Sequence, residues 1–311
     1  MSDDGSILFA GITSLSQHFA DRALFALNAT TLRTIWSADI GQVPVPLLSS
    51  GSALFVVPLT GDADVIHALN GSTGAALWST RVNASGAAIT GMAMSPSGDW
   101  LVVLAPPCVV AALNVSDGAL RWLSDGCPGL PPRGARGPAV RADGVIYAAG
   151  GSDLSFVYAT SLDGAPLWRT DLSGSTTATG FSCTASSLAA ALPSWQASGT
   201  SNVSIMSLSP LSGAELQRVA AYGAATEVSA PAMDAGGMLY VSLMDYEAQR
   251  GCVAAVDTLT NERLWLWCPD DATVRFSARR RVTIGANGTV FVSCGHSNVG
   301  KATIYALTAT S

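Results

Sequence analysis

The chain has 311 residues, of which 49% are hydrophobic and 12% charged, and its formal net charge is −6. This composition is too apolar for a disordered chain and allows a substantial core, and the acidic balance argues against nucleic acid as a partner. The longest apolar stretch, residues 100–113, is interrupted by two prolines and is shorter than the roughly 20 residues that cross a bilayer. We therefore predict no transmembrane segment.

The N-terminal sequence MSDDGSILFAGIT has no basic segment followed by a long apolar run, so we expect no signal peptide in the sequence as given. This leaves two alternatives, a cytosolic protein or a mature domain or fragment of a longer secreted chain. From residue 5 onward, a short apolar run after a Gly- or Ser-containing turn recurs seven times. Each run is rich in β-branched or aromatic residues, which favours a strand. The runs lie at residues 5–12, 50–59, 97–105, 143–150, 185–192, 236–243 and 287–295.

A second motif follows these runs and consists of an alanine, a polar turn and a tryptophan. The clearest copies are ALNATTLRTIW, ALNGSTGAALW and ALNVSDGALRW, and a degenerate copy ends at Gln217. Asn, Ser, Thr and Gly suit a tight hairpin, because they bond their own backbone or tolerate positive φ. We predict that the tryptophans cover junctions between repeats, with each indole N–H bonded to a carbonyl. They are Trp36, Trp78, Trp122, Trp168 and Trp265.

Each repeat of 42 to 49 residues has room for four short strands and shows no helical period. Such repeats predict an all-β fold, a β-propeller of about seven four-stranded antiparallel blades, with residues 1–311 as a single domain. The first repeat lacks an obvious innermost strand, and the seventh copy, which begins at residue 304, does not reach its tryptophan position. We therefore expect an eighth blade if the chain is truncated.

The pattern Ala-x-(Asp/Asn)-x-x-(Thr/Ser)-Gly-x-x-x-Trp resembles the tryptophan-docking motif of pyrroloquinoline-quinone (PQQ) repeat propellers. Ala68, Asn70, Thr73, Gly74 and Trp78 match it at every position, allowing Asn for Asp. That superfamily contains quinoprotein alcohol dehydrogenases and a bacterial outer-membrane assembly lipoprotein, so the resemblance implies a fold and leaves the function open. WD-repeat propellers are the rival class, but no Gly-His and no paired Trp-Asp recurs with the period.

Four of the six cysteines flank hairpin turns symmetrically. Residues equidistant from a hairpin turn face each other, with Cβ atoms roughly 4.5–5.5 Å apart, close to the span of a disulfide. We predict that these four cysteines form two disulfides. The alternative is that they are four small hydrophobic residues on strands. We expect Cys183 and Cys294 to be unpaired. The pairs are Cys108 with Cys127, around residues 117–118, and Cys252 with Cys268, around residues 259–261.

Six asparagines stand in Asn-x-Ser/Thr sequons. Three of them, Asn28, Asn70 and Asn114, occupy the repeat's own turn, where Asn is favoured for backbone reasons. The other three are predicted glycosylation sites: Asn83, Asn202 and Asn287. Together with the cysteine pairs, they predict a secreted glycoprotein, of extracellular or extracytoplasmic location.

No catalytic, cofactor-binding or metal-binding residue is predicted. The three histidines, His18, His67 and His296, fall in three different repeats without a metal-binding spacing. The quinoprotein alcohol dehydrogenases of the superfamily that this chain resembles share three features. They carry a disulfide between adjacent cysteines, a calcium or lanthanide ion, and an Asp base. This chain has no Cys-Cys pair, and its acidic clusters at residues 62–64 and 270–271 are expected to be solvated turns, so neither PQQ nor Ca²⁺ is expected.

Two functions from different classes remain. We favour a non-catalytic, monomeric propeller that binds a protein, peptide or glycan through its loop faces; the alternative is a quinone-dependent oxidoreductase or a truncated part of one. Arg136 and the run Arg279, Arg280 and Arg281 precede equivalent innermost strands, so we expect them to face an anionic ligand. Solvated charge at the strand entrance is the alternative for these arginines.

Overall fold

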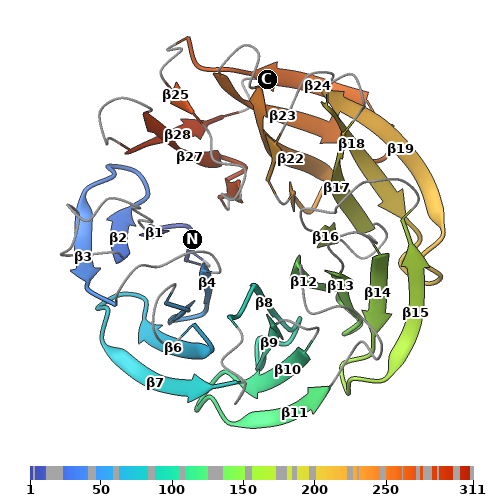
Figure 1. The fold of residues 1–311 in the computed structure, drawn as a ribbon. Coiled ribbons are helices and arrows are strands. Elements are labelled where there is room, and N and C mark those ends of the chain that lie inside the picture. The colour runs from blue at the N-terminus through green and yellow to red at the C-terminus, as the bar shows by residue number, and fades with distance from the viewer. Residues whose placement is uncertain are drawn as a thin grey trace. The chain divides into compact units, whose positions relative to one another are not determined.

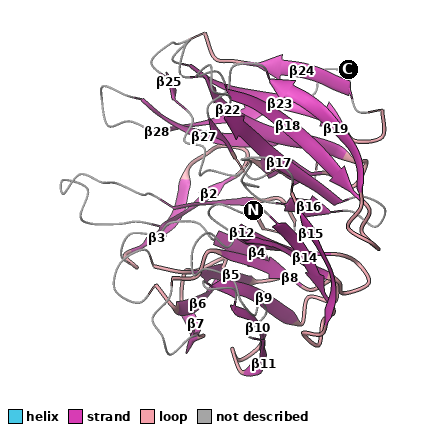
Figure 2. Ribbon diagram, turned by 45° about the vertical axis from the view of Figure 1, so that its right-hand side comes forward, coloured by secondary structure: helices cyan, strands magenta, loops and turns pink. Residues whose placement is uncertain are grey.

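The computed structural model describes the following residues: 1–2, 4–11, 24–40, 47–58, 63–82, 88–105, 109–124, 136–150, 156–172, 181–183, 188–195, 201–222, 227–229, 231–245, 250–260, 262–270, 274–275, 282–285, 287–296 and 302–308. Within these ranges there are 28 β-strands and no helix (Figure 2). The fold is an all-β propeller of seven antiparallel blades, as the repeats predict (Figure 1).

The chain divides into two compact units, Met1–Val140 with Leu162–Gly164 and Arg141–Ser161 with Ala165–Ser311. The prediction of a single domain stays a prediction.

The first unit contains the first twelve strands. They are β1 (Ile7–Gly11), β2 (Leu24–Asn28), β3 (Thr34–Ala38), β4 (Leu47–Ser50), β5 (Ala53–Val56), β6 (Val65–Asn70), β7 (Ala76–Arg81), β8 (Gly91–Met94), β9 (Trp100–Ala105), β10 (Val109–Asn114), β11 (Leu120–Ser124) and β12 (Arg136–Val140). Three sheets here have the orders β1-β2-β3, β4-β5-β6-β7 and β8-β9-β10-β11. In the described residues the first sheet therefore has three strands, in agreement with the missing innermost strand in its sequence.

The second unit contains the other strands. They are β13 (Ile146–Gly150), β14 (Phe156–Thr160), β15 (Pro166–Asp171), β16 (Phe181–Cys183), β17 (Leu188–Trp195), β18 (Ser201–Leu208), β19 (Glu215–Tyr222), β20 (Glu227–Val228), β21 (Ala232–Met233), β22 (Met238–Asp245), β23 (Arg250–Asp257), β24 (Glu262–Trp267), β25 (Val274–Arg275), β26 (Thr283–Ile284), β27 (Val290–His296) and β28 (Ala302–Leu307). In two of its sheets, a pair of short strands shares one edge: β20 and β21 beside β22, and β25 and β26 beside β27.

The alanine of each repeat lies directly opposite the tryptophan in the strand register. Ala68 pairs with Trp78 and Ala255 with Trp265, and the ladder shifts by a β-bulge just after each alanine. Ala68 is fully buried. A small side chain is needed here because a larger one would occupy the space of the indole ring beside it. The repeated alanine is therefore explained by packing.

The core of each unit consists of the inner strands of its blades. In the first unit, Leu54, Phe55 and Leu101 are fully buried, and Phe55 and Leu101 belong to one apolar cluster. In the second unit, Leu239 and Val241 belong to a corresponding cluster. These strands are buried on both faces, which explains why their sequences are apolar runs without alternation.

Candidate functional site

The polar turn of each repeat is organised by the side chain of its Asn or Asp. The Asn70 Oδ1 atom accepts hydrogen bonds from the backbone N–H groups of Ser72 and Thr73, both at 3.0 Å, and from the Thr73 hydroxyl at 3.1 Å. Asn28 and Asp257 make equivalent bonds in their own turns. The side chain thus replaces backbone partners that a turn of this length leaves unsatisfied.

Three tryptophans bond to the turn of the following repeat, as the sequence predicts. The indole Nε1–H of Trp36 donates to the Gly71 carbonyl at 2.8 Å, and that of Trp78 donates to the Val115 carbonyl at 2.9 Å. Trp168 donates to the Pro210 carbonyl at 3.2 Å, and the Tyr147 hydroxyl donates to the same carbonyl at 3.0 Å. In each case the acceptor is the second residue of the turn, so the contact joins neighbouring blades in a fixed register.

The glycine of the turn is required by this docking. Gly118 has φ of +70°, a conformation that L residues rarely adopt, and a Cβ atom placed there would lie 2.5 Å from the Trp78 ring. Gly74 lies under Trp36 and Gly213 under Trp168 in the same way. Glycine is therefore required at this position for two reasons, the left-handed backbone conformation and the tryptophan ring that covers the turn.

A threonine two residues after the tryptophan is a docking residue that sequence reasoning missed. The Thr80 hydroxyl donates to the Gly118 carbonyl at 2.8 Å, and the Thr170 hydroxyl donates to the Gly213 carbonyl at 2.8 Å. The signal was present in the sequence as Trp-x-Thr at residues 78–80 and 168–170. It was not recognised because the acceptor belongs to the next repeat.

The prediction that every indole N–H finds a carbonyl is wrong for Trp122. Its Nε1 atom is buried and has no hydrogen-bond partner among the described residues. The ring packs beside Gly164, whose turn at residues 161–164 is one residue shorter than the turn at 114–118. The shorter turn thus differs from the longer turns, in which the carbonyl of the second residue accepts the bond.

Trp265 contacts aromatic and aliphatic side chains of its own unit. Its ring lies 5.9 Å from that of Tyr240, centroid to centroid, and Leu307 packs against the same cluster. The five predicted docking tryptophans are thus all partly buried beside neighbouring strands.

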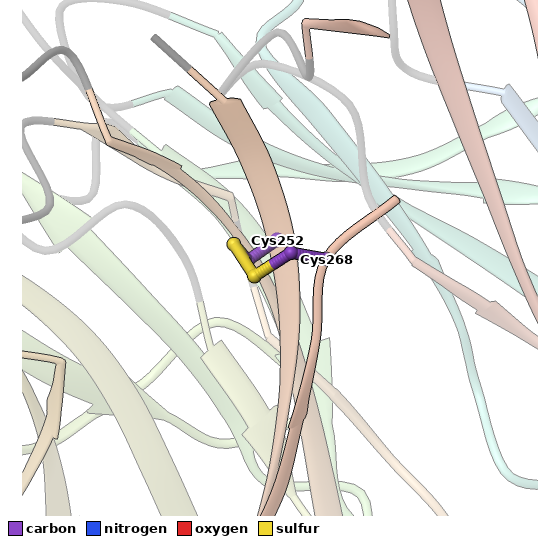
Figure 3. The surroundings of a disulfide bond; sticks show 2 residues. All are labelled: Cys252 and Cys268. Atoms are coloured by element: carbon purple, nitrogen blue, oxygen red, sulfur yellow. A yellow bond between two sulfur atoms is a disulfide. The ribbon is translucent and has the colours of Figure 1, made fainter. Parts of the chain in front are cut away.

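A disulfide joins Cys252 to Cys268, at the position that the symmetric spacing predicts (Figure 3). Cys183 is a free thiol, and burial raises its pKa to about 11, so it stays protonated at neutral pH. Cys108 and Cys127 lie outside the described residues, as does the side chain of Cys294.

The other predicted site residues are only partly within the described part of the chain. Asn287 is exposed, whereas Asn83 and the side chain of Asn202 lie outside the described residues. Of the arginines, Arg136 begins β12 without a described side chain, and residues 279–281 are outside. Their ligand-facing role stays a prediction.

One acidic residue expected to be solvated is buried. Asp64 is 2% exposed and forms an ion pair with the Arg81 guanidinium from the neighbouring strand. Burial of a carboxylate requires such a partner, and the register of β6 and β7, which places Val65 opposite Arg81, supplies it. Asp270, by contrast, is exposed.

The expectation that neither PQQ nor Ca²⁺ is bound stays a prediction. The chain has no adjacent cysteine pair, and no three His, Cys, Asp or Glu side chains converge within the described ranges. His67 instead bonds through Nδ1 to the Ser79 hydroxyl, 2.8 Å away on the paired strand. In the same part of the chain, no helix has the length and hydropathy that a membrane span needs.

Exposed leucines on the second unit are candidates for a binding surface. Leu211 and Leu259 occupy the third position of the turns before β19 and β24, and they are 78% and 75% exposed. Leu216 and Leu264, the second and third residues of those strands, are 64% and 51% exposed. Corresponding turn positions in the first unit are polar, with Ser72 as an example.

A curated relative and two solved structures resemble the chain. The outer membrane protein assembly factor BamB of Yersinia pestis is 31% identical over 166 residues, which cover 50% of this chain and 40% of that protein. The crystal structure of BamB from Moraxella catarrhalis has a TM-score of 0.61 and 16% identity, covering 99% of this chain and 83% of that one. The computationally designed Ika8 protein has a TM-score of 0.61 and 15% identity, covering 97% of this chain and 93% of that one.

The two solved structures support the fold alone at this identity, and the chain matches less than half the length of the curated relative. The family model described as outer membrane protein assembly factor BamB matches residues 20–195, more than half of the chain. Those residues contain the repeats ending at Trp36, Trp78, Trp122 and Trp168, and the chain is a PQQ-like repeat propeller. The chain therefore belongs to the family of outer membrane protein assembly factor BamB.

Proposed function

We propose that this chain is a non-catalytic propeller scaffold that binds another protein, as a factor in protein assembly. The observation that carries the proposal is the family match over residues 20–195. A protein partner is favoured over a peptide or glycan because the curated relative is an outer membrane protein assembly factor.

The internal chemistry of the repeats supports a scaffold. The indole N–H groups, the turn carbonyls and the threonine hydroxyls are used in contacts between blades, for example from Trp78 to Val115 and from Thr80 to Gly118. These bonds fix the frame and leave the loops to carry recognition. Half-exposed or exposed leucines such as Leu211 and Leu259 then offer apolar contact area on that frame.

As part of the same proposal, we place the protein in an extracytoplasmic compartment. The disulfide between Cys252 and Cys268 is of a kind that persists mainly in oxidising environments. We also propose that binding of the partner needs neither PQQ nor Ca²⁺, because the donor set described above does not match such a site.

The test measures binding of the purified chain to an outer membrane β-barrel protein, held unfolded in dilute solution or folded in detergent micelles. The designed propeller Ika8 serves as a control of the same fold. We expect saturable binding that Ika8 lacks and that EDTA or added PQQ leaves unchanged. Equal binding by Ika8, or no binding to either form of the barrel protein, would overturn the proposal.

A parallel sample receives PQQ and Ca²⁺ and is assayed for alcohol-dependent reduction of an artificial electron acceptor. No reduction is expected. Reduction that depends on both additives would show that the chain is an oxidoreductase.

A further inference from the structure

The chain contains two Asn–Gly dipeptides, at residues 70–71 and 287–288, and each is followed by a residue with a hydroxyl group. In such a pair the backbone nitrogen of the glycine can attack the Cγ atom of the asparagine, because no Cβ obstructs its approach. The new C–N bond closes a five-membered succinimide ring, and ammonia leaves. Water then opens the ring to aspartate or isoaspartate.

The folded structure protects the first pair, Asn70–Gly71, from this reaction. The Gly71 N–H donates to the Ser52 carbonyl at 2.7 Å, and the Asn70 Oδ1 atom accepts three hydrogen bonds within the turn. Gly71 is buried, Trp36 bonds to its carbonyl, and Phe9 lies 3.2 Å from the position of a Cβ atom. The turn must open before the nitrogen can reach the side chain.

The second pair lies in an open turn. Asn287 is exposed, and its Oδ1 atom accepts one hydrogen bond, from the Thr289 N–H at 3.1 Å. The Gly288 N–H donates within the same turn, to the Gly285 carbonyl at 2.9 Å. Around the position of a Cβ atom on Gly288 there is no described heavy atom within 4 Å. Among the described residues, the bonds that must break for the attack are local bonds of an exposed turn.

We propose that Asn287 is a site of spontaneous deamidation in the folded protein when its side chain carries no glycan, and that Asn70 is protected. The reaction consumes one water and releases one ammonia, and it replaces a neutral amide with a carboxylate. The isoaspartate product also adds a methylene group to the backbone between β26 and β27. That insertion breaks the bonds from Gly288 to Gly285 and from Gly285 to Thr289, which close the turn.

The experiment incubates the full folded chain at mildly alkaline pH and maps both peptides by mass spectrometry, with an isoaspartate-specific methyltransferase as a second readout. We expect Asn287 to convert at least about tenfold faster than Asn70, which corresponds to an opening cost of about 1.4 kcal/mol or more for the Asn70 turn. In urea the two rates should converge, because the local sequences are nearly the same. Equal rates in the folded chain, or no conversion of Asn287, would overturn the proposal.

Two variants sharpen the result. Trp36→Phe removes the N–H that bonds to the Gly71 carbonyl, so it should accelerate conversion of Asn70 and leave the Asn287 rate unchanged. The unchanged rate of Asn287 also reports that the rest of the chain is folded. Asn287→Gln should abolish the fast phase, since a longer side chain forms a six-membered ring slowly. A fast phase that persists in this variant contradicts the assignment to Asn287.

Discussion

The glycine that lies under a docked tryptophan should be the most sensitive glycine position of the repeat. Gly118 and Gly98 provide a matched pair, with φ of +70° and +76°. A Cβ atom at Gly98 would meet nothing within 4 Å, whereas one at Gly118 would lie 2.5 Å from both the Trp78 Cε3 atom and the Thr80 hydroxyl oxygen. Gly98→Ala therefore measures the cost of the backbone conformation alone, and Gly118→Ala adds the cost of displacing the docked side chains.

The expected magnitudes follow from these contacts. A left-handed alanine costs about 1–2 kcal/mol, which is the whole effect expected for Gly98→Ala. At Gly118 the ring must also move by about 1 Å to restore a normal carbon–carbon contact. That movement costs about 1–3 kcal/mol in packing and weakens the bonds to Val115 and Gly118, at about 1 kcal/mol each. The total for Gly118→Ala is about 4–7 kcal/mol.

The assay is urea unfolding of both variants and of the unaltered chain, followed by tryptophan fluorescence and far-ultraviolet circular dichroism. A double-mutant cycle with Trp78→Ala isolates the contact with the ring, because alanine at 118 should then cost less than it does in the unaltered chain, with the contact to the Thr80 hydroxyl remaining. Equal destabilisation by the two single glycine variants, or no coupling with Trp78, would refute the steric argument.

Four further predictions concern a turn residue and the cysteines of the same frame. Leu32 stands at the glycine position of the first turn with φ of +56°, so Leu32→Gly should raise the free energy of unfolding by up to about 1 kcal/mol in a urea titration. Removing the disulfide with Cys252→Ala and Cys268→Ala together should lower it by about 3 kcal/mol, measured in the same way; no loss would show that the crosslink does not constrain the unfolded chain. At pH 8, native Cys183 should react with iodoacetamide about a hundredfold more slowly than in urea, because its pKa of about 11 leaves little thiolate. Because the pKa of the Cys183 thiol is higher in the folded than in the unfolded chain, the free energy of unfolding should fall as pH rises from about 9 towards 11. In that range the thiol ionises more readily in the unfolded chain.

Much of the frame could be predicted from the sequence, because its determinants are local and repeated. Asn70 is followed by a short polar turn, and the side chain bonds within that turn as residue type and spacing predict. The pairing of Cys252 with Cys268 follows equally from their symmetric distances to a hairpin turn. In both cases the partner lies within one hairpin, so the sequence separation fixes the geometry.

Contacts between repeats, and those set by strand register, were harder to predict. The Thr80 hydroxyl bonds to a carbonyl 38 residues away, so nothing in its own repeat identifies the partner. The burial of Asp64 depends on the pairing that places Arg81 beside it, and two acidic residues close together in sequence indicated a solvated loop instead. For Trp122, the loss of a hydrogen bond accompanies a shorter turn in the next repeat, whose effect requires the three-dimensional contact to be known.

The contact between a tryptophan and the glycine of the next turn also explains the exceptions to the motif. Gly74, Gly118 and Gly213 each lie under a docked tryptophan. Where Gln217 replaces the tryptophan, the glycine position of the following turn holds Asn261. Glycine is thus retained where a ring covers the turn and is replaced where the preceding repeat has no ring to place there.

The motif residues that identify the family are therefore the ones that make the packing contacts between blades. A match built on Trp78, Gly118 and their equivalents establishes how the blades join, and the same contacts would serve any partner. Differences in function must come from positions that the frame does not constrain, such as the turn position that is Ser72 in the first unit and Leu259 in the second. Exchange of polar for apolar residues at that position is compatible with docking, because Trp168 bonds to the Pro210 carbonyl beside Leu211 as Trp36 bonds to the Gly71 carbonyl beside Ser72. The turns before β19 and β24 are for this reason the places where mutation should alter binding without altering stability.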